Sequence, residues 1–227
     1  MRPDFTSGLF GALRRDTGDI WDSYIHHPFV QQLATGKLNP QCFKRFLTQD
    51  YLFLIHFSRA YALLAAKSIT LVDIKQALSG LKAIADELPL HVAYCAKWGL
   101  SEDEMEQEPE AQQTIAYTRY VLDVGHIGDR LDLMAALMPC VAGYAEIGLG
   151  LAASEQTVFD NNPYADWIYA YESEEYAQSV QLSIQYMNSL AEKDMSKAQY
   201  KRLRTIFNKA TQLEIEFWQM GLDAENL

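Results

Sequence analysis

A proline, a thiol, a phenol and a carboxylate occur within eight residues of the otherwise apolar stretch DLMAALMPCVAGYAEIGLG, residues 132–150. Cys140 and Tyr144 are four residues apart, so they share one face of a helix. Pro139 donates no backbone hydrogen bond and opens the helix locally, and a thiol exposed there becomes a nucleophile once it ionises. The pattern indicates a pocket-lining helix with a reactive cysteine, although an inert, buried Cys140 fits the same spacing. Glu146 lies around the helix from Cys140, and we expect it to cap a helix or pair with another one.

A carboxylate also lies in the apolar helical stretch FLTQDYLFLIHF, where Asp50 shares a face with Phe53 three residues later. A carboxylate facing a helical core costs several kcal/mol unless it is paired or meets a polar ligand. Arg59 or Arg119 would be a structural partner for Asp50, and a bound ligand would be a functional one. Both interpretations stay open at this point.

A second carboxylate lies near the C-terminus, in TQLEIEFWQMGL. Glu214 is four residues before Trp218, whereas Glu216 points away from this face. A glutamate beside aromatic rings has a raised pKa, which suits a general acid or base, but an exposed helical glutamate fits the spacing too. Aromatic walls with hydroxyl tips suit a flat polar heterocycle. The candidate phenols are Tyr117, Tyr120, Tyr144, Tyr169 and Tyr171.

A metal site is the main alternative for this set of side chains. Glu87 and His91 have the four-residue spacing that could bind iron or zinc. A di-iron site in a helical bundle needs more carboxylates and a further histidine at similar spacing. Because the last histidine is His126, we expect no metal. A metal-dependent oxidase is kept as an alternative function.

The composition of the chain excludes several classes of protein. A chain of 227 residues is expected to form one domain, residues 1–227. Its net charge of -11 argues against nucleic acid and anionic membranes as partners. The apolar run from Leu133 to Ala145 is too short to span a bilayer and contains a proline. Three cysteines, an odd number, suit a reducing compartment. We therefore expect a soluble, cytoplasmic protein.

Helical periodicity runs through most of the chain, and capping residues mark where helices begin. Strand-like alternation is scarce. The sequence predicts an all-α, single-domain bundle of about eight helices, a class in which ligands bind between facing helices. The predicted helix starts are Asn39-Pro40, Thr70, Ser101 with Glu104, Asn162-Pro163, Ser173 and Ser196 with Gln199.

Taken together, these stretches resemble the thiaminase II (TenA) family of aminopyrimidine hydrolases, within the haem-oxygenase-like superfamily. The resemblance covers most of the chain and depends on the order and spacing of five motifs. These are a His-Pro-Phe entry at 27–29, a Gln-Asp-aromatic helix at 49–51, the Pro-Cys helix at 139–140, W-x-x-x-Y at 167–171 and E-x-x-F-W at 214–218.

The resemblance implies a role for each candidate side chain. Cys140 would be the nucleophile, Asp50 would hold the amino group and ring nitrogen of an aminopyrimidine, and Phe53 would stack on its ring. Glu214 would act as the acid and base, and Tyr171 would donate a hydrogen bond at the reacting end. The further ligand contacts would be Tyr117 and Tyr144. Val141-Ala142-Gly143 are smaller than the resemblance leads us to expect, which leaves the pocket volume open.

The implied reaction converts 4-amino-5-aminomethyl-2-methylpyrimidine, or thiamin, to 4-amino-5-hydroxymethyl-2-methylpyrimidine for thiamin salvage. It uses covalent cysteine catalysis and no metal or cofactor. The resemblance also implies a homotetramer. The residues do not say which of these compounds is preferred. A non-catalytic pyrimidine-binding or regulatory protein is the alternative from another functional class.

Overall fold

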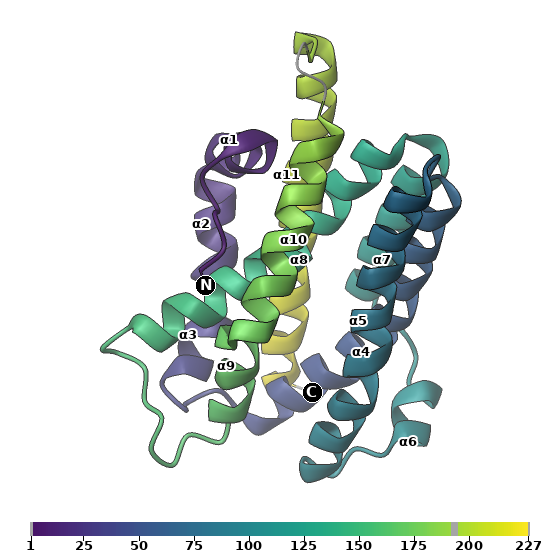
Figure 1. Cartoon of the computed structure of the whole chain (residues 1–227). Coiled ribbons are helices and arrows are strands. Elements are labelled where there is room, and N and C mark those ends of the chain that lie inside the picture. The colour runs from purple at the N-terminus through teal and green to yellow at the C-terminus, as the bar shows by residue number, and fades with distance from the viewer. Residues whose placement is uncertain (1, 192–194, 227) are drawn as a thin grey trace. The chain divides into compact units, whose positions relative to one another are not determined.

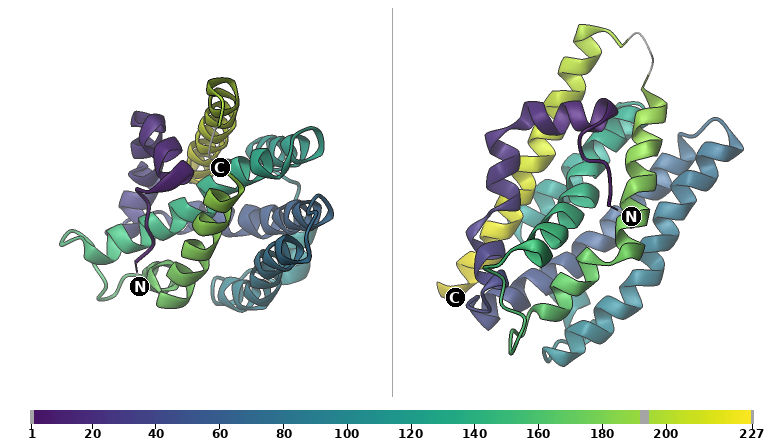
Figure 2. Two further views of the ribbon diagram at one scale, coloured as in Figure 1. Left: turned by 45° about the horizontal axis from the view of Figure 1, so that its top comes forward. Right: turned by 60° about the vertical axis from the view of Figure 1, so that its left-hand side comes forward.

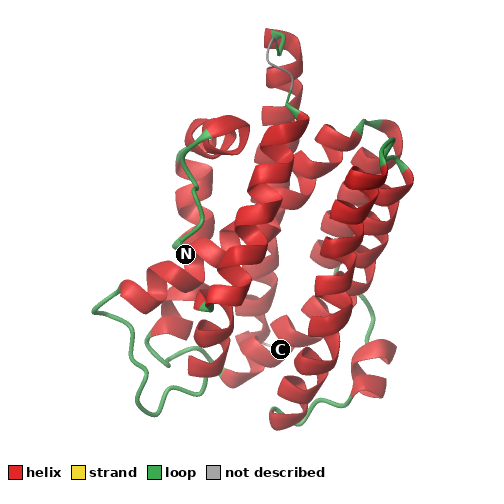
Figure 3. Cartoon of the chain, in the orientation of Figure 1, coloured by secondary structure: helices red, strands yellow, loops and turns green. Residues whose placement is uncertain are grey.

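The chain is helical throughout the part that the structure, a computed structural model, describes. These residues are 2–191 and 195–226, without the side chains of 86, 87, 90 and 226. They contain eleven α-helices and a short 3-10 helix, and no strand (Figure 3). The all-α prediction is therefore confirmed. The number is higher than the predicted eight or so, because the chain before Asn39 forms three short helices that separate at Gly18 and at His26 and His27.

The chain divides into two compact units, each built from two segments. Unit one comprises residues 1–38 and 134–215, and unit two comprises residues 39–133 and 216–227. Our expectation of a single domain over residues 1–227 stays a prediction. The side chains assigned to the candidate site fall into both units.

Unit one has an aromatic core. The rings of Trp21 and Phe207 stack, with centroids 5.5 Å apart, and Tyr24 and Phe10 meet Trp21 edge-on. All four side chains are fully buried or nearly so. The helices of this unit are α1 (Gly8–Thr17), α2 (Asp19–Ile25), α3 (Pro28–Ala34), most of α8 (Arg130–Ala153), α9 (Ala165–Glu172), α10 (Glu174–Leu190) and most of α11 (Lys197–Asp223).

Glu146 links three helices of unit one. Its carboxylate accepts a hydrogen bond from Trp21 Nε1 at 3.0 Å and two from the Arg14 guanidinium, one of them from Nε at 2.7 Å. The bond to Glu146 raises the pKa of Arg14, so the guanidinium stays charged. The prediction that Glu146 pairs with another helix is confirmed.

Unit two is a set of long helices. In it α4, α5 and α7 lie side by side (Figures 1 and 2). Fully buried side chains of α4 such as Phe43 and Phe46 belong to its core. The helices of this unit are α4 (Pro40–Ala66), α5 (Leu71–Lys97), α6 (Glu102–Gln107), α7 (Gln112–Ile127), the start of α8, the end of α11 and the 3-10 helix η1 (Ala224–Asn226).

Capping side chains begin these helices where the sequence predicted them. Asn39 accepts the backbone N–H of Gln41 at 2.9 Å, Thr70 caps α5, and Ser101 forms a capping box with Glu104. The predicted start at Asn162-Pro163 is wrong by two residues, since α9 begins at Ala165. The Asn162 side chain accepts the N–H of Tyr164 and so forms a turn before the helix.

α8 is longer than the apolar run seen in the sequence. It has 24 residues and keeps its helical conformation through Pro139. By length and hydropathy α8 could cross a membrane, but 72% of its most apolar window is buried inside the protein. Such burial is typical of a core helix, because a membrane span exposes its apolar side chains to lipid.

Candidate functional site

Two phenols hold the backbone of α8 on either side of Cys140. Tyr24 Oη donates to the carbonyl of Pro139 at 3.4 Å, and Tyr176 Oη donates to the carbonyl of Val141 at 3.3 Å. A carbonyl oxygen has two lone pairs, so it can accept a side-chain bond while it takes part in a helix. The main chain that carries the thiol is thus fixed from α2 and from α10.

An aromatic cluster lies beside the next turn of α8. Tyr144 is buried, and its ring centroid is 5.0 Å from that of Tyr171 and 6.0 Å from that of Trp167. Tyr171 also meets Trp167 at 4.6 Å and the edge of Tyr176 at 5.0 Å. The structure therefore brings together two predicted site residues, Tyr144 and Tyr171. Tyr169 is not part of this aromatic cluster, since it is half exposed and stacks on Phe159.

Two glycines of α8 allow neighbouring segments to approach its backbone. A Cβ on Gly148 would lie 2.6 Å from the carbonyl carbon of Tyr171, and one on Gly143 would lie 2.1 Å from the Tyr24 ring. Because the residues after Cys140 are small, the sequence did not predict the volume of the pocket beside them. At position 143 the buried ring of Tyr24 fills that space. Sequence reasoning missed Gly148, although a glycine inside a helix is a signal of close packing.

Glu214 is the buried glutamate of α11. Its side chain is 2% exposed, whereas Glu216 is exposed. The prediction that one of the two faces the interior is confirmed, and its catalytic role stays a prediction. A carboxylate this deeply buried must interact with polar groups or a ligand to remain ionised.

Asp50 lies beside His91, and not beside the arginines that the sequence offered. His91 Nδ1 is 3.8 Å from Asp50 Oδ2, and both side chains are about nine-tenths buried. Arg119 instead binds Glu110 through two bonds of 2.6 Å, and Arg59 contacts His56. Sequence reasoning considered His91 only as a metal ligand, and so it missed this pair.

Gln49 connects the helix of Asp50 to the helix of Tyr117. Its buried side-chain oxygen accepts the N–H of Ala111, at the start of α7, at 2.8 Å and the hydroxyl of Thr114 at 2.6 Å. Alanine has no side chain to cap a helix, so the side chain of Gln49 pairs the buried N–H at the start of α7. The Tyr117 ring is then held 5.0 Å from that of Phe53.

The rings of Phe53 and Tyr117 are both buried within unit two. Phe53 also packs on Phe57 at 5.0 Å and on Phe217 at 5.7 Å. The structure therefore groups three predicted residues in this unit, Asp50, Phe53 and Tyr117. Cys140, Tyr144, Tyr171 and Glu214 lie in unit one. Tyr120 is half-buried on α7, and burial raises its pKa to about 12.

The three cysteines differ in environment. Cys42 and Cys95 are fully buried, and burial raises the pKa of both thiols, that of Cys95 to about 12. Cys42 Sγ also donates to the carbonyl of Leu222 at 3.2 Å. Cys140 is partly exposed. Of the three cysteines, Cys140 is therefore the one most accessible to a reagent or substrate.

The described residues contain no group of three or more His, Cys, Asp or Glu side chains arranged to hold a metal ion. The pair of Glu87 and His91, which the sequence offered as a possible metal site, is not tested, because the side chain of Glu87 lies outside the described residues.

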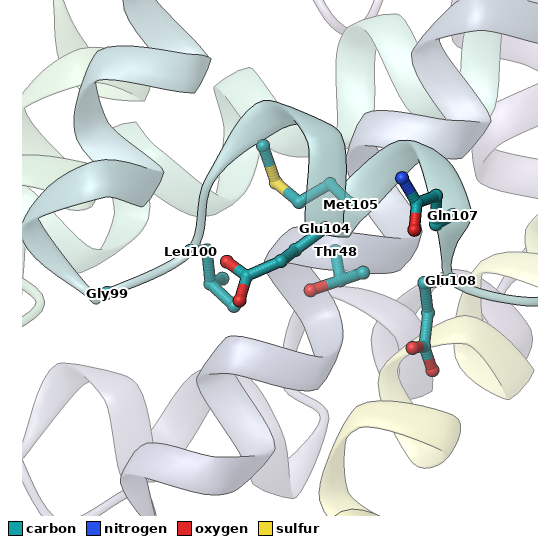
Figure 4. A pocket seen from close by; sticks show the side chains of 7 residues that line it. All are labelled: Thr48, Gly99, Leu100, Glu104, Met105, Gln107 and Glu108. Atoms are coloured by element: carbon teal, nitrogen blue, oxygen red, sulfur yellow. The ribbon is translucent and has the colours of Figure 1, made fainter.

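A surface pocket of about 370 Å³ lies in unit two, and none of the predicted site residues lines it (Figure 4). It is formed by α4, α6 and the loops on either side of α6. Its two glutamates already have partners, since Glu104 binds Ser101 and Glu108 binds Arg45. The lining residues are Thr48, Gly99, Leu100, Glu104, Met105, Gln107 and Glu108.

Comparison with known proteins gives consistent matches. The model of the TENA/THI-4/PQQC family matches residues 14–224. An aminopyrimidine aminohydrolase from Halalkalibacterium halodurans is 38% identical over 203 residues, which are 89% of this chain and 90% of that protein. A crystal structure described as a TenA family transcription regulator, from a Silicibacter species, is 40% identical. It has a TM-score of 0.89 and covers 94% of this chain and 96% of that chain.

A more distant structure shows the fold alone. A Shewanella denitrificans domain with a haem-oxygenase-like fold has a TM-score of 0.76 at 14% identity and covers 95% of this chain and 93% of that chain. The predicted haem-oxygenase-like fold is confirmed.

Replacing Gly148 with alanine is expected to displace Tyr171. The new Cβ would meet the main chain of Tyr171, which cannot rotate away, so the free energy of unfolding should fall by about 1–3 kcal/mol. The exposed Gly150 has no atom within 4 Å of its Cβ position, and Gly150→Ala should gain about 0.5–1 kcal/mol. Urea unfolding of both variants measures the difference, and equal effects would contradict this packing.

Cys140 is expected to react first with a thiol reagent. At pH 8 Cys95 is almost entirely in its unreactive thiol form, since its raised pKa lies about four units higher. Iodoacetamide followed by peptide mass spectrometry would identify the modified residue. Cys140→Ser should remove the fast phase of labelling. A fast phase on Cys42 or Cys95 in the folded protein would contradict the prediction.

Proposed function

We infer the function of this chain from its family: the chain belongs to the TENA/THI-4/PQQC family, and it is an aminopyrimidine aminohydrolase. Such an enzyme hydrolyses carbon–nitrogen bonds in pyrimidines related to thiamin. The observation that carries this conclusion is the 38% identity to an aminopyrimidine aminohydrolase over nearly the whole of both chains. The resemblance to the thiaminase II family in the sequence is thereby confirmed.

The substrate we propose is 4-amino-5-aminomethyl-2-methylpyrimidine, with thiamin as an alternative, and the pathway is thiamin salvage. The Cys140 thiolate adds to the electron-poor ring, and the ring electrons then expel the amine, or the thiazole of thiamin, from the exocyclic methylene. Glu214 gives a departing amine its proton, whereas the thiazolium of thiamin leaves as neutral thiazole and needs none. Water adds to the methylene with Glu214 as base, the thiolate leaves, and 4-amino-5-hydroxymethyl-2-methylpyrimidine is released with ammonia. No metal or cofactor takes part.

The environments of the side chains support these roles. Cys140 is the partly exposed cysteine of the chain. Glu214 is buried, and burial favours the protonated form that an acid needs. Tyr171 and Tyr144 form one aromatic contact beside the turn that follows Cys140. In unit two, Asp50 would hold the amino group and ring nitrogen, and the buried rings of Phe53 and Tyr117 would contact the heterocycle.

Ammonia release from 4-amino-5-aminomethyl-2-methylpyrimidine tests the mechanism. Cys140→Ser should abolish turnover, because the hydroxyl is a far weaker nucleophile. Glu214→Gln should lower kcat by about 10²–10⁴, the usual contribution of a general acid–base group. Glu216→Gln, an exposed glutamate two residues later, should stay within about twofold of the unchanged protein.

The second candidate is a pyrimidine-binding regulator, since the relative from Silicibacter is described as a transcription regulator. Well-folded protein that binds the pyrimidine with and without Cys140, but releases no ammonia, would favour this alternative. Equal loss of activity in Glu214→Gln and Glu216→Gln would instead contradict the acid–base assignment.

We propose a cytoplasmic homotetramer as the working form. Lys67 Nζ donates to the carbonyl of Gly128 at 2.9 Å and so joins the α4–α5 turn to the α7–α8 turn. Large apolar side chains are exposed on these turns, and such groups mark interaction surfaces. They are Ile69 (85%), Leu71 (65%), Val72 (77%) and Ile127 (80%).

Sedimentation velocity of the purified protein should show four times the mass of one chain. Replacing Ile69 and Ile127 with serine should shift the boundary toward smaller species without unfolding the chain, since neither side chain contributes to the core. Monomeric sedimentation of the unchanged protein would contradict this assembly.

A further inference from the structure

His91 is held in a defined orientation inside unit two. Its Nε2 is 3.3 Å from the carbonyl of Leu47, and its Nδ1 is 3.8 Å from Asp50 Oδ2. Its ring also lies nearly parallel to that of Tyr51, at 6.5 Å. Because a carbonyl only accepts hydrogen bonds, the Leu47 contact places a proton on Nε2. One end of the imidazole is thus anchored to the α4 backbone, and the other faces the carboxyl group of Asp50.

This orientation sets the chemistry at Asp50. A neutral His91 with its proton on Nε2 presents a lone pair at Nδ1, and an ionised Asp50 presents lone pairs as well. The two groups attract each other only when a proton lies between them, either on Nδ1 or on the carboxyl oxygen. Burial lowers the pKa of His91. In such a pair the two groups titrate together.

The neighbouring titratable groups do not compete for this proton. Tyr51 on α4 has its hydroxyl 3.1 Å from carboxylate oxygens of Glu102 and Glu106 of α6, and burial raises its pKa. Cys95 follows His91 by one turn of α5, and burial together with the charge of Asp50 raises its pKa to about 12. Both groups keep their protons at neutral pH.

We propose that His91 is a positioning residue for Asp50: the proton shared with Nδ1 keeps Oδ2 turned toward the imidazole and leaves Oδ1 as the oxygen that accepts a hydrogen bond from a ligand. The amino group at the edge of an aminopyrimidine is the complementary donor. This inference rests on the proposed function, in which Asp50 holds that edge.

Three substitutions of His91 separate its two contacts. The amide of asparagine reaches about as far as Nδ1, that of glutamine about as far as Nε2, and phenylalanine keeps only the ring volume. Calorimetry with 4-amino-5-hydroxymethyl-2-methylpyrimidine measures Kd. His91→Asn should stay within about threefold of the unchanged protein. His91→Gln and His91→Phe should each weaken binding about 10- to 100-fold, the usual worth of a hydrogen bond to a charged group.

Two controls distinguish positioning from packing. Cys95→Ala truncates a fully buried side chain on the same face of α5, and Kd should change less than twofold. In a protein that already carries Asp50→Asn, His91→Phe should add less than twofold, because its effect acts through Asp50. Thermal unfolding shows whether each variant is folded.

Each result supports or overturns the proposal. Equal Kd values in the three His91 variants, better binding by glutamine than by asparagine, or a His91 effect that persists without the Asp50 carboxylate would overturn it. In those cases the wild-type protein still binds the pyrimidine and releases ammonia, so the proposed function stands. Wild-type protein that neither binds the pyrimidine nor releases ammonia would overturn the proposed function, and the role of His91 with it.

Discussion

The close approach of neighbouring segments to the backbone of α8 is the constraint on which unit one depends. Two phenols, from Tyr24 and Tyr176, bind main-chain carbonyls on either side of Cys140, and two glycines admit Tyr24 and the main chain of Tyr171. These contacts act on the backbone, so they fix the main chain that carries the thiol, and the Cys140 rotamer then sets where the sulfur points. The apolar side chains of α8 are buried in the protein, and the ion pair between Glu146 and Arg14 joins α8 to α1.

Unit two achieves the same end with a polar side chain. Gln49 fastens the start of α7 to α4, and the next residue along the helix carries the carboxylate that meets His91. Adjacent residues on a helix point about 100° apart, so Gln49 can contact α7 while Asp50 contacts α5. The rings of Phe53 on α4 and Tyr117 on α7 meet between the same two helices.

Local features of the fold could be predicted from the sequence, whereas contacts between distant segments could not. The caps at Asn39, Thr70 and Ser101 depend on side chains two or three residues from the helix start, so their spacing is visible in the sequence. The three short helices before Asn39 escaped prediction because a seven-residue helix carries few apolar repeats. Asp50 was recognised as unusual, but its neighbour His91 is on another helix, and charge alone favoured an arginine. The buried position of Glu214 was predictable from its spacing to Trp218, since both lie on one helix.

The packing of Tyr24 against Gly143 makes the identities of two distant positions interdependent. With the tyrosine ring in place, hydrogen is the side chain that fits at position 143. A larger residue there becomes acceptable only after position 24 has lost its ring, so the order of substitutions during divergence is constrained. A relative with an aromatic residue at this point of the helix can fill the same space from α8 itself and carry a small residue in place of Tyr24. Transfer of either residue between two such proteins would therefore succeed only when both are exchanged together.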